Sequence, residues 1–288
     1  MSDPSQNDLE SSFTHPAVPG GEPALERTVS NEDFHPGEPP QRVHYSEWDP
    51  RSAPGTYFLI AINVAVFLWM IFHGVSPTSP GLLQLLHYGA NNPSMVLGGQ
   101  WWRLVTATFV HIGMIHIATN MWCLWNLGLL GEPLLGPVGL IAVYLLTGVA
   151  GNLLSIAWDL ILGSQAQLVL GVGAGASGAV FGIAGILIIL LSNRRLPIPW
   201  SELQRLRTSV VRFAAINLVI GVATRFGGPI RIDNSAHIGG FLSGLALGPS
   251  LVPYMTRGRA SYLGHQKIVF IAAAFILSLI GYWLANFK

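Results

Sequence analysis

The chain has 288 residues, of which 51% are hydrophobic and only 10% are charged, and its formal net charge is +1. Soluble globular proteins carry about 25% charged residues, so this composition excludes an ordinary soluble domain and indicates an integral membrane protein. The small net charge is the sum of an acidic N-terminal part and a basic remainder of the chain. Residues 1–50 contain ten acidic and two basic residues, whereas the other 238 contain 13 Lys and Arg against four Asp and Glu. Membrane topology accounts for this basic excess, so it requires no nucleic-acid partner.

The first region, residues 1–54, is acidic and rich in Pro, Glu and Ser. Such a composition cannot bury a core, and we expect this region to be disordered. It lacks the Arg-rich, acid-poor bias of a mitochondrial transit peptide, which favours a bacterial plasma membrane as the location. The single cysteine, Cys123, excludes an intramolecular disulfide and is expected to pack as a small apolar residue.

Seven apolar spans follow. They cover residues 56–74, 111–130, 137–158, 174–192, 209–224, 236–252 and 268–287. A helix that crosses a bilayer needs about 20 such residues, so each span predicts a membrane helix, although the fifth and sixth are slightly short. The spans show no alternation of period two, which excludes a membrane β-barrel. The predicted fold class is therefore all-α and polytopic.

Basic residues orient these helices, because Lys and Arg collect on the cytoplasmic side of membrane proteins. If seven helices alternate, the N-terminal region and the loops 193–208 and 253–267 lie on one side. That side, with Arg212 just beyond the first of these loops, holds 11 basic residues, and the other side holds four. The N-terminus is therefore predicted to be cytoplasmic and the C-terminus to be outside.

This topology brings four polar side chains to one depth near the outer side. His116 and Asn120 lie four residues apart in the second span, so they share a helix face. Ser177 and His237 open the fourth and sixth spans. Ionisable groups at such a depth are costly, and we therefore interpret these residues as functional.

Glycines repeat every four residues beside this layer, at Gly178 and Gly182 and at Gly240, Gly244 and Gly248. Small residues at this spacing allow membrane helices to approach closely. The same spacing also occurs in helical bundles that have no catalytic role, so the glycines alone leave both interpretations open.

The four polar residues fit an acyl-transfer reaction. A serine hydroxyl needs a base to become a nucleophile, and His237 can serve Ser177 in that way. The reaction creates an oxyanion, which the Asn120 amide, a ring nitrogen of His116 and the helix-opening N–H of Ser177 could stabilise.

Two further residues have alternative interpretations. Asp233 precedes His237 by four residues and could orient its ring, but a solvated loop aspartate is the stronger interpretation, so a dyad is predicted. Phe181, one turn after Ser177, could stack on the imidazole or could simply be a core or lipid-facing aromatic residue.

Four motifs occur in a fixed order: Trp102-Arg103, His116-xxx-Asn120, Gly175-x-Ser177-Gly178 and Ala236-His237-xx-Gly240-xxx-Gly244. Together they resemble the signature of the rhomboid intramembrane serine proteases. The resemblance covers residues 55–252 and implies a six-helix catalytic core. Residues 253–288 then form a cytoplasmic loop and a seventh helix, as in the six-plus-one members of that family.

The resemblance implies that Ser177 is the nucleophile, that His237 is the general base, and that His116 and Asn120 form the oxyanion hole. It implies an enzyme without metal or cofactor that cuts transmembrane protein substrates near their outer end. The supporting positions that it implies are Gly175, Phe181, His111 at the mouth of the site, Trp102 and Arg103 in the membrane-embedded first loop, and the structural acid Glu132. Phe181 departs from the family pattern, which often has Tyr there.

Other protein classes fit less well. The run from Gly171 to Ala176 matches a dinucleotide fingerprint, but an apolar span follows it and no acid lies about 20 residues on. No histidine is followed by the Glu of a zinc-protease motif. A non-catalytic rhomboid-like protein that binds membrane clients would lack the serine or the histidine, and a transporter would show an internal repeat.

Overall fold

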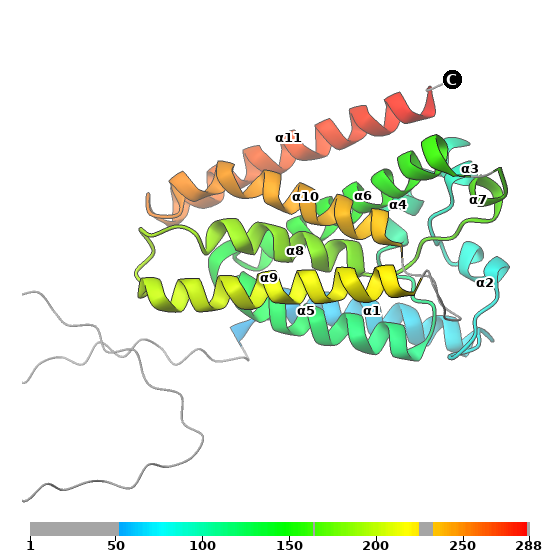
Figure 1. Cartoon of the computed structure of the whole chain (residues 1–288), viewed down its shortest axis with the longest axis horizontal. Coiled ribbons are helices and arrows are strands. Elements are labelled where there is room, and N and C mark those ends of the chain that lie inside the picture. The colour runs from blue at the N-terminus through cyan, green and yellow to red at the C-terminus, as the bar shows by residue number, and fades with distance from the viewer. Residues whose placement is uncertain (1–51, 164, 225–232, 287–288) are drawn as a thin grey trace, which may run out of the picture. The chain divides into compact units, whose positions relative to one another are not determined.

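The computed structural model describes residues 52–163, 165–224 and 233–286, and long helices dominate them (Figure 1). The seven long helices of this described part are α1 (Pro54–Phe72), α5 (Met114–Leu135), α6 (Pro137–Leu162), α8 (Ser177–Leu190), α9 (Trp200–Ala223), α10 (Asn234–Leu251) and α11 (Arg259–Ala285). Each overlaps one predicted span, so the all-α class is confirmed. The described residues form no β-strand and contain only an isolated bridge between Asn91 and Gly173. The acidic region predicted over residues 1–54 lies almost wholly outside them.

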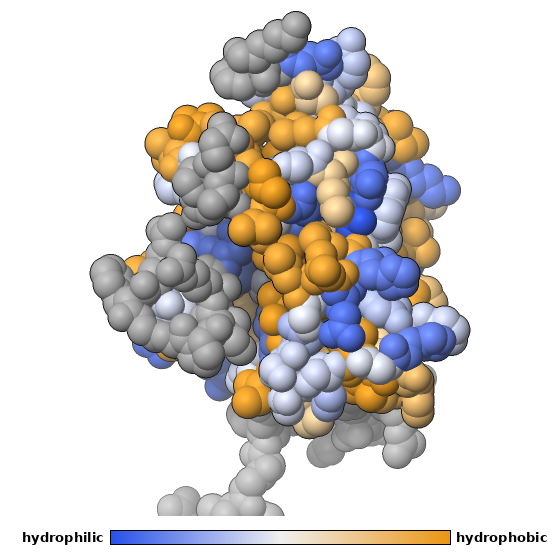
Figure 2. Space-filling model, turned by 90° about the vertical axis from the view of Figure 1, so that its right-hand side faces the viewer, coloured by the Kyte–Doolittle hydropathy of each residue, from blue (hydrophilic) through white to orange (hydrophobic). Residues whose placement is uncertain are grey.

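The long helices run side by side, and the short helices gather near one end of them, which we call the short-helix end (Figure 1, right). The short helices are α2 (Leu82–His87), α3 (Pro93–Leu97), α4 (Arg103–Thr106) and α7 (Gln165–Leu170). At the opposite end the chain passes from α8 to α9, and from α10 through a 3-10 turn (Val252–Tyr254) to α11. Seen from the short-helix end, the surface mixes hydrophilic and hydrophobic residues (Figure 2).

By length and apolar composition, four of the described helices can cross a membrane alone, namely α1, α6, α9 and α11. Helix α8 has only 14 residues, so it is about 21 Å long and cannot span a hydrocarbon core of about 30 Å. It is also the most deeply buried helix, with neighbours on all sides. Helix α8 therefore cannot reach both surfaces of the hydrocarbon core, and its first residue is Ser177.

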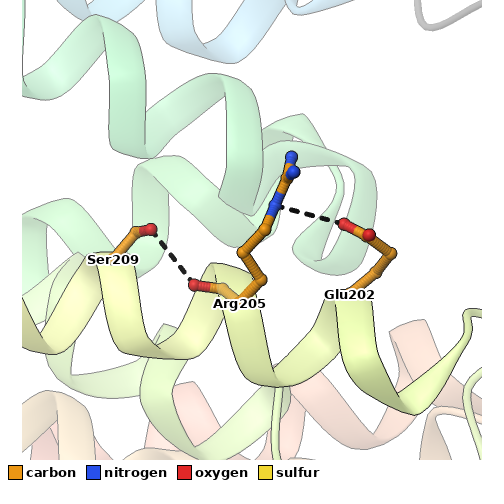
Figure 3. Close-up of polar contacts among 3 residues, drawn as sticks. All are labelled: Glu202, Arg205 and Ser209. Atoms are coloured by element: carbon orange, nitrogen blue, oxygen red, sulfur yellow. Dashed lines mark hydrogen bonds and ion pairs between the residues drawn. The ribbon is translucent and has the colours of Figure 1, made fainter. Parts of the chain in front are cut away.

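Two helices begin nine residues earlier than the apolar spans predict, because their first turns are polar. Helix α9 begins at Trp200 rather than at residue 209, and α11 begins at Arg259 rather than at residue 268. The first turns of α9 carry local polar contacts (Figure 3). Arg205 pairs with Glu202 at 3.3 Å, and the Ser209 hydroxyl donates to the Arg205 carbonyl at 3.1 Å. Such contacts support a helix that apolar periodicity alone does not reveal.

The centre of the bundle is the contact between α8 and α10, where glycines allow the two backbones to touch. A Cβ atom added at Gly240 would overlap the carbonyl oxygen of Gly178, and one added at Gly244 would overlap that of Gly182. The four-residue glycine spacing therefore predicted this close helix pair correctly. This close contact holds α10 against α8 near the first turns of both helices.

A buried carboxylate closes the N-terminus of α1. Glu132 of α5 is 4% exposed, and it accepts hydrogen bonds from the Gly55 N–H at 2.8 Å and from the Thr56 N–H and hydroxyl, both at 2.7 Å. The first N–H groups of a helix lack partners within it and carry partial positive charge, so an anion is stabilised there. Glu132 therefore has a structural role in joining α5 to α1.

Arg103 organises the segment between α1 and α5. Its guanidinium donates to the carbonyl oxygens of Leu86 and Ala90 at 2.6 and 3.0 Å and to the Gln100 side chain at 2.7 Å. It also lies 4.5 Å from the centre of the Trp102 ring. Arg103 thus holds together the irregular chain around α2, α3 and α4, and its described bonds all lie within that segment.

Candidate active site

Ser177 is the first residue of α8, and the chain that leads into it is fixed by two hydrogen bonds. The Gly175 N–H donates to the Ala107 carbonyl at 2.9 Å, and the Ala176 N–H donates to Nε2 of His111 at 3.4 Å. Gly175 has φ +132°, a conformation that side chains rarely adopt. A Cβ atom there would also lie 2.6 Å from the His116 ring. Only glycine therefore permits this approach of the serine loop to α5.

His111 is fully buried, and its two ring nitrogens have different partners. Nδ1 lies 3.1 Å from the Phe109 carbonyl oxygen, to which it must donate, while Nε2 accepts from the Ala176 N–H. These partners assign a neutral ring with its proton on Nδ1. His111 therefore acts through the backbone just before Ser177, which is a positioning role.

His237 lies in the first turn of α10 and is 5% exposed. Its ring stacks on Phe181 with centroids 4.3 Å apart and an angle of 15° between the planes. Phe181 is one turn after Ser177 on α8, so the stack holds the imidazole against the first turns of that helix. The phenyl ring makes this contact without a hydroxyl group. Phe181 is also 5% exposed, so it stacks on the imidazole and belongs to the buried core at the same time.

The neighbours of Ser177 and His237 also touch. A Cβ atom at Gly178 would lie 3.3 Å from the carbonyl oxygen of Ala236. The described hydrogen bonds do not include one between Ser177 and His237.

Asp233 does not behave as the solvated loop residue that the sequence favoured. Its carboxylate caps α10 by accepting from the Ala236 N–H at 3.1 Å and from the Ser235 hydroxyl, and it also accepts from Ser155 of α6. Within the described part of the chain, Nδ1 of His237 has no hydrogen-bond partner. Asp233 therefore anchors the helix that carries His237 but does not bond to its ring.

His116 and Asn120 lie on one face of the first turns of α5. The Asn120 amide donates to the His116 carbonyl at 3.0 Å, which leaves its second amide hydrogen for another acceptor. Nδ1 of His116 accepts from the Ile112 N–H at 3.3 Å, so the ring proton is assigned to Nε2. That nitrogen faces Gly175, two residues before Ser177, with the Asn120 amide nitrogen nearby.

A cavity of about 260 Å³ lies beside these groups and is lined by Ser177, His116 and Gly175 among others. Its wall includes Asn152, which is 9% exposed and donates to the Leu104 carbonyl at 2.8 Å. Sequence reasoning missed Asn152, although an amide inside the apolar span 137–158 is a signal that could have found it. The cavity leaves open space next to Ser177.

Metal chemistry has no evident ligand set in this region. The described residues contain no group of three or more His, Cys, Asp or Glu side chains arranged to hold a metal ion.

Trp102 is half exposed and lies with Arg103 in the segment before α5, and neither residue lines the cavity. The structure thus brings together Ser177 with Gly175 and His116, and His237 with Phe181.

Comparison with known proteins gives a consistent result. Residues 98–254 match the model of the Rhomboid domain family. Over 190 residues the chain is 33% identical to Rhomboid protease GluP of Bacillus subtilis, which covers 66% of this chain and 33% of that protein. It is 28% identical over 239 residues to Rhomboid protease AarA of Providencia stuartii, covering 78% and 81% of the two chains. It is 31% identical over 190 residues to Rhomboid-like protease 2 of Toxoplasma gondii, covering 65% and 62%.

Proposed function

The chain belongs to the rhomboid family, and from this membership we propose that it is a serine endopeptidase that cleaves transmembrane protein substrates within the bilayer. It is an integral membrane protein with several membrane helices. The observation that carries the proposal is the convergence on the first turns of α8. Ser177 begins that helix, His237 stacks on its Phe181, and His116 packs against the Gly175 that precedes it.

In the proposed reaction, Ser177 attacks the carbonyl carbon of a peptide bond while His237 accepts the hydroxyl proton. The resulting imidazolium then returns this proton to the leaving amine, and an acyl-enzyme remains on Ser177. Water, activated by His237, hydrolyses the acyl-enzyme and releases the second product. In this second step His237 takes a proton from the attacking water and returns it to the Ser177 oxygen as the acyl C–O bond breaks, so the histidine acts in turn as base, acid, base and acid.

Charge develops on the carbonyl oxygen in both tetrahedral intermediates, and three donors are proposed to stabilise it. They are the Nε2–H of His116, the free amide hydrogen of Asn120 and the backbone N–H of Ser177. The Ser177 N–H lies at the positive end of the α8 dipole and has no acceptor within the helix. Such fixed donors are usually the largest single contribution to catalysis of this kind.

The placement of the reaction in the membrane is also part of the proposal. The 14-residue α8 cannot reach both surfaces of the bilayer core, and the asymmetry of basic residues supports a cytoplasmic N-terminus, from which α8 would start at the outer side with Ser177. Together these features favour cleavage near the outer face, in a bacterial plasma membrane, with the C-terminus outside. Neither metal nor cofactor takes part in the proposed steps.

Proteolysis by protein reconstituted in liposomes tests this function. Wild type is expected to cleave a model transmembrane substrate, and Ser177→Ala is expected to have no activity while it folds and inserts normally. Ser243→Ala is the matched control, because it also removes a membrane-helix hydroxyl, one that donates to the Gly240 carbonyl of its own helix. Cleavage by a well-folded Ser177→Ala protein would exclude Ser177 as the nucleophile.

A further inference from the structure

A hollow lined by hydrogen-bond donors lies on α9, at the opposite end of the bundle from Ser177. It has a volume of about 430 Å³, and the residues that line it are Ser201, Gln204, Arg205, Arg207, Thr208, Ser209 and Arg212. All of them except Arg207 are exposed, and those six recur every three or four residues, so they form one face of the helix. None of them takes part in the proposed reaction.

The hollow carries a net positive charge, because three arginines, Arg205, Arg207 and Arg212, line it and Glu202 is the carboxylate paired with one of them. Glu202 pairs with Arg205 at 3.3 Å (Figure 3), but an exposed pair of this kind contributes little. Among the described residues, the Arg212 side chain has neither an ion pair nor a hydrogen bond. Arg207 donates to the Ser192 hydroxyl, a neutral acceptor, at 3.2 Å. Guanidinium groups beside hydroxyl and amide donors are typical of phosphate sites.

The exposed side chains of α9 change from polar to apolar beyond Arg212, and this change indicates where the hollow lies relative to the bilayer. Beyond Arg212 the exposed side chains are apolar, including Ile216 and Val219 at 58% and 68% exposure. On the other side of the hollow, Arg194 lies 4.4 Å from the centre of the Trp200 ring. Tryptophan and arginine favour the membrane–water interface. The hollow therefore lies at the level of the lipid headgroups.

We propose that this hollow binds the phosphate of an anionic phospholipid headgroup, with Arg205 and Arg212 as its charge partners. The two residues are about 10 Å apart along the helix axis, a separation that two extended arginine side chains can close around one headgroup. Thr208 lies between them, with its hydroxyl on the same face.

The general excess of basic residues on one side of a membrane protein does not by itself explain this arrangement. Orientation requires only charge, and Arg195 supplies charge without lining the hollow: it is exposed and lies in the loop between α8 and α9. What the hollow adds is the neutral donors Ser201, Gln204 and Thr208 on the same face. Arg195 therefore offers a control that removes an equal charge from the same region.

Native mass spectrometry of the full chain in detergent tests the proposal, with phosphatidylglycerol and phosphatidylcholine of equal chain length as probes. Wild type and Arg195→Gln are expected to retain phosphatidylglycerol in preference to phosphatidylcholine. Arg205→Gln and Arg212→Gln are each expected to weaken that retention about fivefold, and the double variant more. Arg212→Gln removes a side chain without described partners, so its folding, followed by circular dichroism, is expected to be unchanged.

Three results would overturn the assignment. The first is equal retention of the two lipids by wild type. The second is equal retention of phosphatidylglycerol by the double variant and by Arg195→Gln. The third is displacement of the lipid by inorganic phosphate at matched concentration, which would make the hollow a site for the free anion. Because cleavage activity is not the readout, failure of this proposal is distinct from failure of the proposed protease function.

Discussion

The imidazole of His237 lies flat on the phenyl ring of Phe181, with the ring centroids 4.3 Å apart. This contact joins the first turn of α10 to α8, one turn beyond Ser177. The Asp233 carboxylate bonds elsewhere, and Nδ1 of His237 has no partner among the described residues. The orientation of the proposed base therefore depends on stacking, whereas in a Ser-His-Asp triad a carboxylate holds the ring.

Replacement of Phe181 tests this dependence. Phe181→Leu keeps an apolar side chain but loses the flat face, and aromatic pairs contribute about 0.5–1.5 kcal/mol beyond burial. We expect kcat to fall by up to about tenfold with KM little changed, and Phe181→Tyr to retain wild-type kcat. Steady-state kinetics on one transmembrane substrate measures both. Equal kcat for the Leu and Tyr variants would show that the stack does not position the base.

The α8–α10 contact predicts that Gly240→Val destabilises the protein. The new side chain would meet the backbone of Gly178, which cannot move aside as a side chain can. Overpacking typically costs about 1–3 kcal/mol, so thermal unfolding in detergent is expected at a clearly lower temperature. Gly264→Ala in α11 is the control, because a Cβ atom there meets nothing within 4 Å. The prediction fails if both variants unfold at the wild-type temperature.

The hydrogen bonds of Glu132 to the N-terminus of α1 lead to a second prediction about stability. Glu132→Ala leaves the buried Gly55 and Thr56 donors without an acceptor, and each unsatisfied buried group costs about 1–3 kcal/mol. A large decrease in the unfolding midpoint is expected, and a smaller one for Glu132→Gln, which keeps one carbonyl oxygen. If the alanine variant were as stable as wild type, the link between α5 and α1 would not matter for the fold.

The proposed oxyanion donors predict a kinetic defect without loss of the nucleophile. His116→Ala and Asn120→Ala each remove one donor, which typically lowers kcat by about 10²–10³. The double variant is expected to lose less than the product of the two effects, because both donors serve one oxygen atom. Ser177 is expected to keep its reactivity toward small acylating reagents. Full additivity, or unchanged kcat in either single variant, would remove these residues from the oxyanion hole.

Much of the fold follows from the sequence because the bilayer restricts the possibilities. Apolar spans of membrane length predicted all seven long helices of the described part, and the glycine repeat predicted the α8–α10 contact. The polar start of α9 escaped prediction, because apolar length does not detect the face that carries Arg205 and Ser209. The short helices escaped as well, because they depend on tertiary partners such as the Arg103 bonds to Leu86 and Ala90.

For the candidate site, the sequence predicted the residues better than it predicted their contacts. The candidate residues were identified from motif order and helix ends, and the stack of Phe181 on His237 was one of the alternatives, but most of the hydrogen-bond partners were not identified. Asp233 precedes His237 by four residues, a spacing that suits either a ring contact or a helix cap, and only the structure shows the cap. Asn152 was overlooked because one amide in an apolar helix has no periodic signal.

The central claim is that Ser177 is a nucleophile activated by His237, and covalent labelling with a fluorophosphonate tests it most directly. The site of labelling is mapped by mass spectrometry of peptides from wild type, Ser177→Ala and His237→Ala, each first shown to be folded. The account predicts a single labelled position, Ser177, in wild type, none in Ser177→Ala, and strongly reduced labelling in His237→Ala. Labelling of a different serine, or normal labelling of Ser177 in the His237→Ala protein, would contradict it.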